Sequence, residues 1–337
     1  MDKQERIMVS ICCITYNHEK YVAKAIEGFL MQETDFKYEV VVHDDASTDH
    51  TADIIRSYEQ KYPEIIKPIY QTINQHSKGV RVLPTFIYPK ATGKYIALCE
   101  GDDYWTDPHK LKKQVDHMEQ NPGCTFCFHN AFLENDTAGL LKKAMVPHTD
   151  QNKKYYSNQN RKYNAGELQL LGFIPTASFL YPKKVVNDLP DWYFDAPAGD
   201  LAIKLIATSH GYAYYINEIM SVYRINVQSS MTAQWKKEDR TKKIQRIKGF
   251  VSTLDAFDKW TDHRFGNEIE ESKTSFELRL ELAKGNKRML SEERYKDYFR
   301  KLGSREKINL YIRLYFPRLI TFLKETLPFD LKYRLVR

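Results

Sequence analysis

The first hundred residues contain three apolar runs, and each run ends in a cluster of polar side chains. The runs are Ile7 to Thr15, Tyr38 to His43 and Tyr95 to Cys99, and their short length and β-branched content predict buried strands. Helical spacing separates them, most clearly over Glu19 to Gln32. Repeated strand–helix–strand units with short connections predict an α/β fold with a mostly parallel sheet flanked by helices.

Two adjacent carboxylates, Asp102 and Asp103, follow the third run. Asp107 and Pro108 come next and suit the N-cap and first position of a helix over 107–119. We therefore expect the acidic pair in a strand-to-helix loop at the carboxyl edge of the sheet, where open α/β sheets bind ligands. Such a pair can hold a hard divalent cation against a diphosphate. For an isolated pair, a solvated acidic turn is the alternative.

The other two runs end in polar clusters that a parallel sheet brings to the same edge. Thr15, Tyr16 and Asn17 end the first run, and Asp44 and Asp45 end the second. Hydroxyl, amide and carboxylate groups can bind a base edge or ribose hydroxyls. The alternative is local: a strand-end turn, capping of the following helices, and aspartates that only solvate the turn.

Later polar residues also allow two interpretations. Asp200 precedes a helix predicted from Leu201 and is either its cap or a general base. Arg224 follows a strand-like run and either faces a diphosphate or forms an exposed salt bridge. For Lys78 and Arg81 we favour a solvated surface over phosphate contacts.

Composition places the chain among soluble globular proteins, with 42% hydrophobic and 28% charged residues in 337. This length suits one large domain plus an extension. The formal charge of +7 favours anionic partners such as nucleotide diphosphates or acidic lipids. Because the basic residues are dispersed and no recognition motif is present, we expect no nucleic-acid partner.

The sequence predicts a cytoplasmic protein. No apolar run approaches the roughly 20 residues of a membrane span, and the N-terminus does not resemble a signal peptide. Four of the five cysteines lie in strand-like runs, as buried free thiols do. Cys124 and Cys127 form a lone C-x-x-C without a second ligand pair, which argues against structural zinc.

Two segments differ in composition from the rest. Residues 135–164 are polar and predict an excursion or mobile loop. Residues 305–337 mix leucine, tyrosine and phenylalanine with arginine and lysine, which suits a peripheral helix on anionic lipid. A helix packed on the rest of the chain and a homodimer contact remain alternatives.

Five motifs in order resemble family-2 glycosyltransferases of the GT-A fold, of the bacterial surface-polysaccharide type. They are residues 13–21, 42–49 and 93–105, with Gly199-Asp200 and Ser221 to Arg224 as the later ones. The resemblance covers roughly residues 7–226. It implies a GT-A catalytic domain over 1–230 with a Rossmann-like nucleotide-binding half, followed by a charged, helical extension over 231–337.

The resemblance also implies roles for particular residues. Asp103 would ligate Mg²⁺ or Mn²⁺, and Asp200 would be the catalytic base. The donor, a nucleotide-diphosphate sugar and by expectation a UDP-sugar, would contact Thr15, Tyr16, Asn17, Glu19, Asp45, Asp102 and Arg224. Asn226 stands where family members often have histidine, which puts one metal or diphosphate contact in doubt.

The implied reaction is inverting transfer of a hexosyl or hexosaminyl group to a hydroxyl of a saccharide or lipid-linked saccharide. A nucleotidyltransferase is the rival enzyme, but it should have a glycine-rich basic loop after the first strand, where this chain has Tyr16-Asn17-His18-Glu19. A non-catalytic sugar-binding adaptor on the same fold is the rival from another class. The acidic residues at 102, 103 and 200 argue against it.

Overall fold

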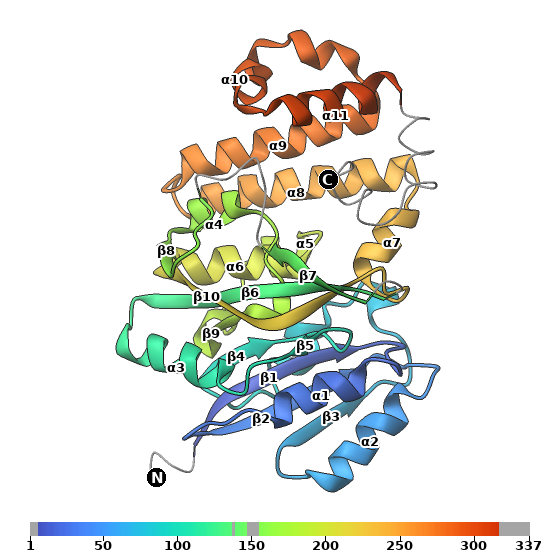
Figure 1. The fold of residues 1–337 in the computed structure, drawn as a ribbon, viewed down its shortest axis with the longest axis vertical. Coiled ribbons are helices and arrows are strands. Elements are labelled where there is room, and N and C mark those ends of the chain that lie inside the picture. Colours follow the sequence, from blue (N-terminus) through green and yellow to red (C-terminus); the bar gives the residue numbers. More distant parts are fainter. Residues whose placement is uncertain (1–5, 137–138, 147–154, 317–337) are drawn as a thin grey trace.

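The computed structural model describes residues 6–136, 139–146 and 155–316. Within these residues the strands form one sheet in the order β3-β2-β1-β4-β9-β6-β10-β5, with β7 paired to β6 and β8 paired to β10 (Figure 1). The strands are β1 Ile7–Thr15, β2 Lys37–Asp44, β3 Ile66–Tyr70, β4 Tyr95–Leu98, β5 Tyr104–Trp105, β6 Cys124–Asn135, β7 Gly139–Val146, β8 Arg161–Tyr163, β9 Leu180–Pro182 and β10 Tyr212–Ile225.

The sheet is parallel in its first half and mixed in its second. Strands β3, β2, β1 and β4 pair in parallel, as predicted, and β6 pairs in parallel with β10. Strand β9 is antiparallel to β4 and β6, and β5 is antiparallel to β10. Thr15 pairs with Asp44 and Asp44 with Tyr70, so the ends of the first three strands share one edge of the sheet.

Helices flank the sheet, and the later ones are stacked beyond it. The α-helices are α1 Val22–Leu30, α2 Thr51–Lys61, α3 Lys110–Gln120, α4 Ala165–Leu171, α5 Asp191–Asp195, α6 Gly199–Ser209, α7 Met231–Lys237, α8 Arg240–Trp260, α9 Gly266–Lys284, α10 Glu293–Lys301 and α11 Ser304–Tyr315. The described residues also form short helical turns, namely η1 His76–Lys78, η2 Leu83–Ile87, η4 Thr176–Ser178, η5 Lys183–Val186 and η6 Lys287–Ser291. Helices α8 and α9 lie beyond α4 to α6, and α10 and α11 form the far end (Figure 1). Among the described helices, none has both the length and the apolar character of a bilayer span.

The two faces of the sheet are buried in separate cores. On β1, Ile11 and Cys13 pack on one side, while Cys12 packs on the other. This follows from the period-two alternation of side chains along a strand. Because both faces of the strand are covered, the run has no polar alternation, and this is why it is readable in the sequence as a buried strand.

The helical extension packs partly on the first 230 residues and partly on itself. Leu201 and Leu205 on α6 pack with Phe250, Leu254 and Phe257 on α8. A smaller cluster around residues 278–314 joins α9 and η6 to α10 and α11. Hydrophobic burial therefore joins α8 to the sheet-bearing part of the chain.

The helix expected over 107–119 begins later than predicted, at Lys110. His109 occupies the N-cap position without a side-chain bond, and the Asp107 carboxylate accepts the His109 N–H at 2.7 Å instead. Gln32 supplies the tertiary contact, because its amide accepts the Leu111 N–H at 3.0 Å and donates to the Asp107 carbonyl at 2.8 Å. The Gln32 side chain, from the loop after α1, thus replaces the local cap. Strand β5 also intervenes between the acidic pair and this helix.

The segment expected to be an excursion, 135–164, contains two strands. Strand β7 pairs with β6 and β8 pairs with β10, both antiparallel. Residues 137–138 and 147–154 of the segment lie outside the described residues. The strands escaped prediction because β8 is short and polar, β7 carries two lysines at its centre, and the segment as a whole is polar in composition.

Candidate active site

Residues 100–103, here called the acid loop, connect β4 to β5 at the carboxyl edge of the sheet. Asp102 and Asp103 are buried. The Asp103 Oδ1 atom accepts the backbone N–H of Arg224 at 2.7 Å, and the Arg224 Nη1 atom donates to the Asp102 carbonyl at 2.7 Å. The end of β10, the strand that pairs with β5, therefore fixes the acid loop.

Arg224 is not the exposed salt-bridging residue that its sequence context favoured. It is only 7% exposed, and its Nε atom donates to Glu134 Oε2 at 2.8 Å. Its guanidinium carbon lies 4.5 Å from the ring centre of Tyr104 and 5.1 Å from that of Tyr21. Glu134, which the sequence interpretation missed, is the counter-charge that permits this burial.

One oxygen of each loop aspartate is buried without a hydrogen-bond partner among the described residues: Asp102 Oδ1 and Asp103 Oδ2. Burial, and then the charges of Asp102 and Glu100, raise the pKa of Asp103 well above its usual value. Buried carboxylate oxygens of this kind need a proton or a cation. Oxygen-only donors suit Mg²⁺ or Mn²⁺, which also take ligands from a substrate diphosphate.

The protein itself supplies few metal ligands. Within the described part of the chain, no group of three or more histidine, cysteine, aspartate or glutamate side chains is arranged to hold a metal. The acid loop therefore fits a cation only as a partial site, completed by phosphate oxygens.

Gly101 lets the acid loop lie directly on the end of β1. A Cβ atom at this position would come within 2.5 Å of Thr15 Cγ2 and 2.9 Å of His18 Nδ1. The Gly101 N–H also donates to the Ile14 carbonyl at 2.9 Å. No larger residue fits unless the first and fourth strands move apart.

The Thr15 hydroxyl lies inside the protein, so the expected contact with a base does not follow from this geometry. The side chain is fully buried, and Oγ1 donates to the His43 carbonyl at 3.1 Å and lies 3.3 Å from Asp44 Oδ1. Its role in the structure is to join the ends of β1 and β2. Burial by the neighbouring strand could not be read from the local sequence.

Asn17 and Glu19 connect the loop after β1 to the loop after β2. Asn17 has a left-handed backbone with φ 55°, and its Oδ1 accepts the Thr48 N–H at 2.8 Å. Glu19 Oε2 accepts the His50 N–H at 3.1 Å. Tyr16, beside them, is half-buried. Tyr16, Asn17 and Glu19, which were predicted to contact the nucleotide sugar, lie in one loop. The Asn17 and Glu19 side chains hold this loop to the loop after β2.

Asp45 is buried and does not merely solvate its turn. Its two carboxylate oxygens accept the backbone N–H groups of Gln75 at 2.8 Å and His76 at 3.0 Å. Asp45 therefore holds the loop after β3, where η1 begins. The carboxylate is at the predicted place, but backbone amides occupy both of its oxygens.

Asp200 is the second residue of α6, whose N-cap is Ala198. Its Oδ1 atom accepts the Leu201 N–H at 2.7 Å, so the helix end orients the carboxylate. Burial raises the pKa of Asp200, while the charge of Lys204 lowers it. Lys204, one turn later, is buried, donates to the Gly172 carbonyl at 3.1 Å, and has its pKa lowered by burial to about 8. The sequence interpretation missed Lys204, although the i, i+4 spacing was a readable signal.

Electrostatics connect Asp200 to the acid loop. Burial and then the charges of Asp102 and Asp200 raise the pKa of Glu100 to about 8. Asp102 and Asp200, which belong to distant segments of the chain, therefore both act on the charge of Glu100 in the acid loop.

Arg81 contradicts the expectation of a solvated surface residue. Its guanidinium donates to the Phe194 carbonyl from Nε at 3.2 Å and from Nη2 at 3.0 Å, and Nη2 also donates to the Ala196 carbonyl. These carbonyls end α5, four to six residues before Asp200. Arg81 thus connects the loop after β3, which Asp45 holds, to the residues that directly precede Asp200.

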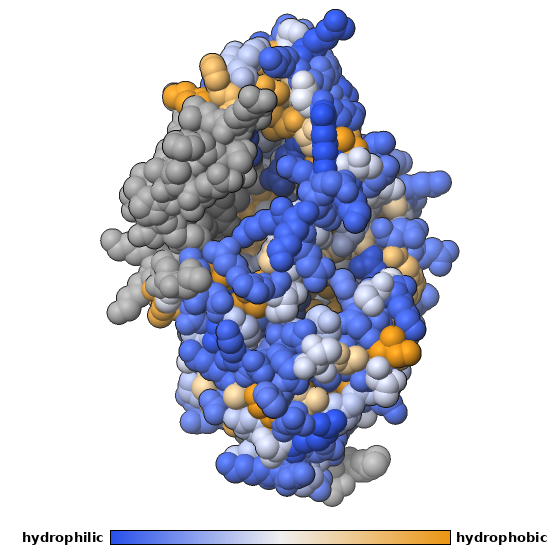
Figure 2. Space-filling model, turned by 90° about the vertical axis from the view of Figure 1, so that its right-hand side faces the viewer, coloured by the Kyte–Doolittle hydropathy of each residue, from blue (hydrophilic) through white to orange (hydrophobic). Residues whose placement is uncertain are grey.

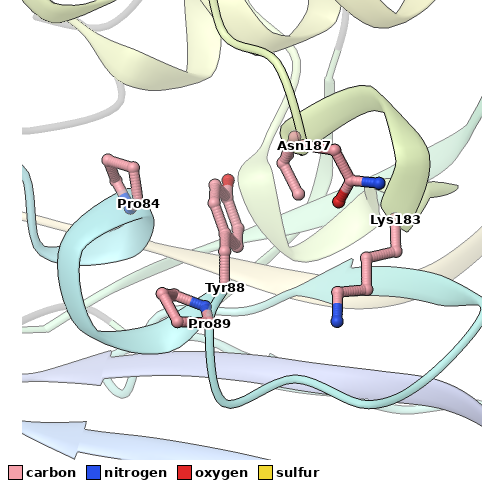
Figure 3. Close-up of a pocket in the computed structure, with 6 residues that line it drawn as sticks. Pro84, Tyr88, Pro89, Lys183 and Asn187 are labelled. Atoms are coloured by element: carbon pink, nitrogen blue, oxygen red, sulfur yellow. The ribbon is translucent and has the colours of Figure 1, made fainter.

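A separate cavity of about 210 Å³ lies between η2 and η5 (Figure 3). It is lined by Pro84, Tyr88, Pro89, Lys183, Val186 and Asn187. Tyr95, the first residue of β4, pairs with Pro182, next to this lining, whereas the acid loop follows the other end of β4. None of the predicted site residues lines the cavity.

Comparison with known proteins gives consistent results. A family model described as Glycosyl transferase family 2 matches residues 10–189. The uncharacterized protein Rv1520 of Mycobacterium tuberculosis is 34% identical over 259 residues, which is 74% of this chain and 67% of that protein. TuaG of Bacillus subtilis, a putative teichuronic acid biosynthesis glycosyltransferase, is 26% identical over 71% of this chain and 89% of its own length.

WfaP of Escherichia coli is similar over a shorter region. Its name is UDP-Glc:alpha-D-GlcNAc-diphosphoundecaprenol beta-1,3-glucosyltransferase, and it is 32% identical over 38% of this chain and 48% of its own length.

Two solved structures share the fold. S. aureus TarS 1-349 in complex with UDP-GlcNAc has a TM-score of 0.59 at 16% identity, covering 98% of this chain and 84% of that one. The mannosyltransferase PcManGT of Pyrobaculum calidifontis, in complex with GDP-Man and Mn²⁺, has a TM-score of 0.53 at 14% identity, covering 93% and 86%.

Proposed function

Because this chain belongs to glycosyltransferase family 2, we propose that it transfers a hexosyl or hexosaminyl group from a UDP-sugar, with inversion, to a saccharide hydroxyl. The observation that carries the proposal is the acid loop, in which Asp102 Oδ1 and Asp103 Oδ2 are buried without a hydrogen-bond partner among the described residues. A UDP donor is supported by the relative WfaP, which is named as a UDP-Glc glucosyltransferase, and by the structurally similar TarS, which was solved in complex with UDP-GlcNAc.

The acid loop is the proposed diphosphate end of the site. Asp103, supported by Asp102, would hold Mg²⁺ or Mn²⁺, which supplies charge neutralisation of the diphosphate leaving group. Arg224 keeps both aspartates in place through its backbone N–H and its guanidinium. Gly101 packs this loop closely on the end of β1.

Asp200 is the proposed general base. Its Oδ1 is oriented by the Leu201 N–H, so the carboxylate can accept the proton of the acceptor hydroxyl while the acceptor oxygen attacks the anomeric carbon. Burial raises its pKa, which brings basicity closer to that needed near neutral pH. The charge of Lys204 keeps the carboxylate ionised until it takes the proton. One base and a direct displacement through an oxocarbenium-like transition state account for inversion.

The test separates chemistry from donor binding. We expect Asp200→Asn to lose transfer by at least a hundredfold and to keep donor affinity within about threefold, since a general base contributes roughly 10²–10⁴. Asp103→Ala should instead lose the thermal stabilisation that UDP-sugar and Mn²⁺ give together. Near-normal turnover in Asp200→Asn, or unchanged metal-dependent stabilisation in Asp103→Ala, would refute the respective role.

A screen of UDP-, GDP- and dTDP-sugars by thermal stabilisation, with and without Mn²⁺, identifies the donor. A ligand that binds only the native state raises its stability in proportion to the logarithm of concentration over Kd. Stabilisation by GDP-sugars alone would overturn the UDP assignment. Absence of both stabilisation and donor hydrolysis across the screen would favour the non-catalytic adaptor.

We further propose that residues 1–230 carry catalysis and that the extension rests on the cytoplasmic face of an anionic membrane, near a lipid-linked acceptor. Helix α11 buries Leu310 and Leu314 and exposes Ile308, Tyr311 and Tyr315. Apolar residues gather at the end of the molecule that carries α10 and α11, above an otherwise mostly hydrophilic face (Figure 2). An exposed apolar face beside basic residues is the composition of an interfacial helix. Residues 317–337, part of the segment predicted to contact the membrane, lie outside the described residues.

Flotation with liposomes tests this contact. The double variant Ile308→Ser/Tyr311→Ser removes exposed apolar area while the buried leucines keep the helix folded. We expect the wild type to float with phosphatidylglycerol vesicles and the variant to stay in solution. Equal flotation of both proteins would refute the membrane contact. If, in addition, sedimentation showed that the substitutions convert a dimer to a monomer, the exposed face would be a dimer contact instead.

A further inference from the structure

Phe173 is an exposed aromatic residue at the rim of the candidate active site. It follows Gly172, which ends α4 with a positive φ of 93°, and its side chain is 38% exposed. Its ring packs on that of Tyr223, with ring centres 5.0 Å apart and planes inclined by 52°. The contact with Tyr223 restricts the orientation of an otherwise solvent-facing ring.

Tyr223 connects this ring pair to the acid loop. It lies on β10 directly before Arg224, whose backbone N–H holds Asp103. Burial, and then the charges of Asp103, Glu100 and Asp102, raise the pKa of Tyr223. The rings are therefore next to the loop that the proposed function assigns to the diphosphate.

The other side of Phe173 connects to the proposed base. The carbonyl of the preceding residue, Gly172, accepts the Lys204 Nζ hydrogen bond at 3.1 Å. Lys204 lies one turn after Asp200 on α6, and each side chain shifts the pKa of the other. Lys204 thus anchors the Phe173 backbone to the helix that carries Asp200.

We propose that Phe173, backed by Tyr223, is the platform on which the acceptor pyranose stacks. This inference rests on the proposed function and names the acceptor subsite of that same centre. The C–H face of a pyranose is apolar, and an exposed aromatic ring in a polar site is the surface that it can cover. Because Asp200 must reach an acceptor hydroxyl, the exposed ring anchored beside its helix contacts the acceptor rather than the nucleotide.

The experiment compares acceptor and donor parameters in matched variants. Initial rates are measured with the UDP-sugar identified by the donor screen, and with octyl pyranosides as acceptor probes. We expect Phe173→Ala to raise the acceptor KM about tenfold, equivalent to about 1.4 kcal/mol, with donor KM and donor hydrolysis within about twofold. Phe173→Trp should keep the acceptor KM near that of the wild type, because it restores a flat ring.

Trp260→Ala is the control, since Trp260 is 39% exposed but lies at the end of α8. Thermal unfolding of each variant checks that the fold is retained. Acceptor KM values that are equal in wild type and Phe173→Ala, with transfer intact, overturn the platform. A donor KM that rises together with the acceptor KM also overturns it. A wild type that neither hydrolyses donor nor transfers sugar instead refutes the proposed function, so the two failures are distinguishable.

Discussion

Replacing Arg224 by methionine tests the inference that a buried guanidinium holds the acid loop. The change keeps most of the side-chain volume and removes the charge. It breaks the Nε bond to Glu134 at 2.8 Å and the Nη1 bond to the Asp102 carbonyl at 2.7 Å. The backbone N–H that binds Asp103 remains, so the loop loses one of its two anchors on β10.

The expected loss of stability follows from burial. Removing one partner of a buried ion pair costs roughly 3–5 kcal/mol, because the other charge stays desolvated. The Glu134 side chain is 20% exposed and recovers some hydration, so the lower end of this range applies. We expect the free energy of unfolding to fall by about 3 kcal/mol, roughly a hundredfold in the folding equilibrium.

Arg56→Met is a closely matched control. Arg56 also makes a 2.8 Å bond to a carboxylate, that of Asp53, and lies 4.9 Å from the ring centre of Tyr70. Both partners of this pair are well exposed, so its loss should cost about 0–1 kcal/mol.

Urea unfolding followed by tryptophan fluorescence measures both variants, and the shift in midpoint at equal slope gives the difference. Titration of UDP-sugar with Mn²⁺ then reports whether the loop still binds the donor. We expect weaker metal-dependent binding in Arg224→Met and none of this loss in Arg56→Met. Equal destabilisation by the two substitutions would show that burial of Arg224 is not what holds the loop.

Three further outcomes follow from the same contacts. Lys204→Met removes a charge that lowers the pKa of Asp200, so the acid limb of the kcat/KM profile should move to higher pH; an unmoved limb would contradict the pairing. Gly101→Ala places a Cβ atom 2.5 Å from Thr15 Cγ2 and should destabilise the fold by about 1–3 kcal/mol in urea unfolding, and an unchanged midpoint would refute the close packing. Arg81→Ala frees the carbonyls that precede Asp200 and should lower kcat about tenfold with donor affinity retained, whereas a rise in donor Kd alone would assign Arg81 to nucleotide binding.

Local patterns were sufficient to predict β1, β2 and β4, but not the two-residue strand β5, which is defined by its pairing with β10. Strand β1 has the predicted bounds Ile7–Thr15, because burial on both faces makes its sequence continuously apolar. The α3 boundary was wrong because Gln32, on another segment, satisfies the Leu111 N–H. Helix ends depend on four amides each, and any nearby acceptor can take the place of the local cap.

Some features of the candidate site could be predicted from local sequence, and others depend on distant segments of the chain. The positions of Asp102, Asp103 and Asp200 at element ends are visible in the sequence, since strand ends and helix starts have local signals. The capture of both Asp45 oxygens by the amides of Gln75 and His76 is not, because it depends on how the loop after β3 folds back. A carboxylate after a strand looks the same in sequence whether it binds a ligand or a loop.

By itself the sequence determined an α/β chain whose acidic residues stand at strand and helix ends, because periodicity and end signals are short-range properties of the backbone. Only the tertiary structure decided that Arg224 is buried against the acid loop, across 122 positions of chain. It also decided that Arg81 reaches the carbonyls before Asp200 and that Phe173 stands on Tyr223. Those contacts arise from hydrophobic packing and electrostatics between distant segments, and no local window of sequence contains both partners.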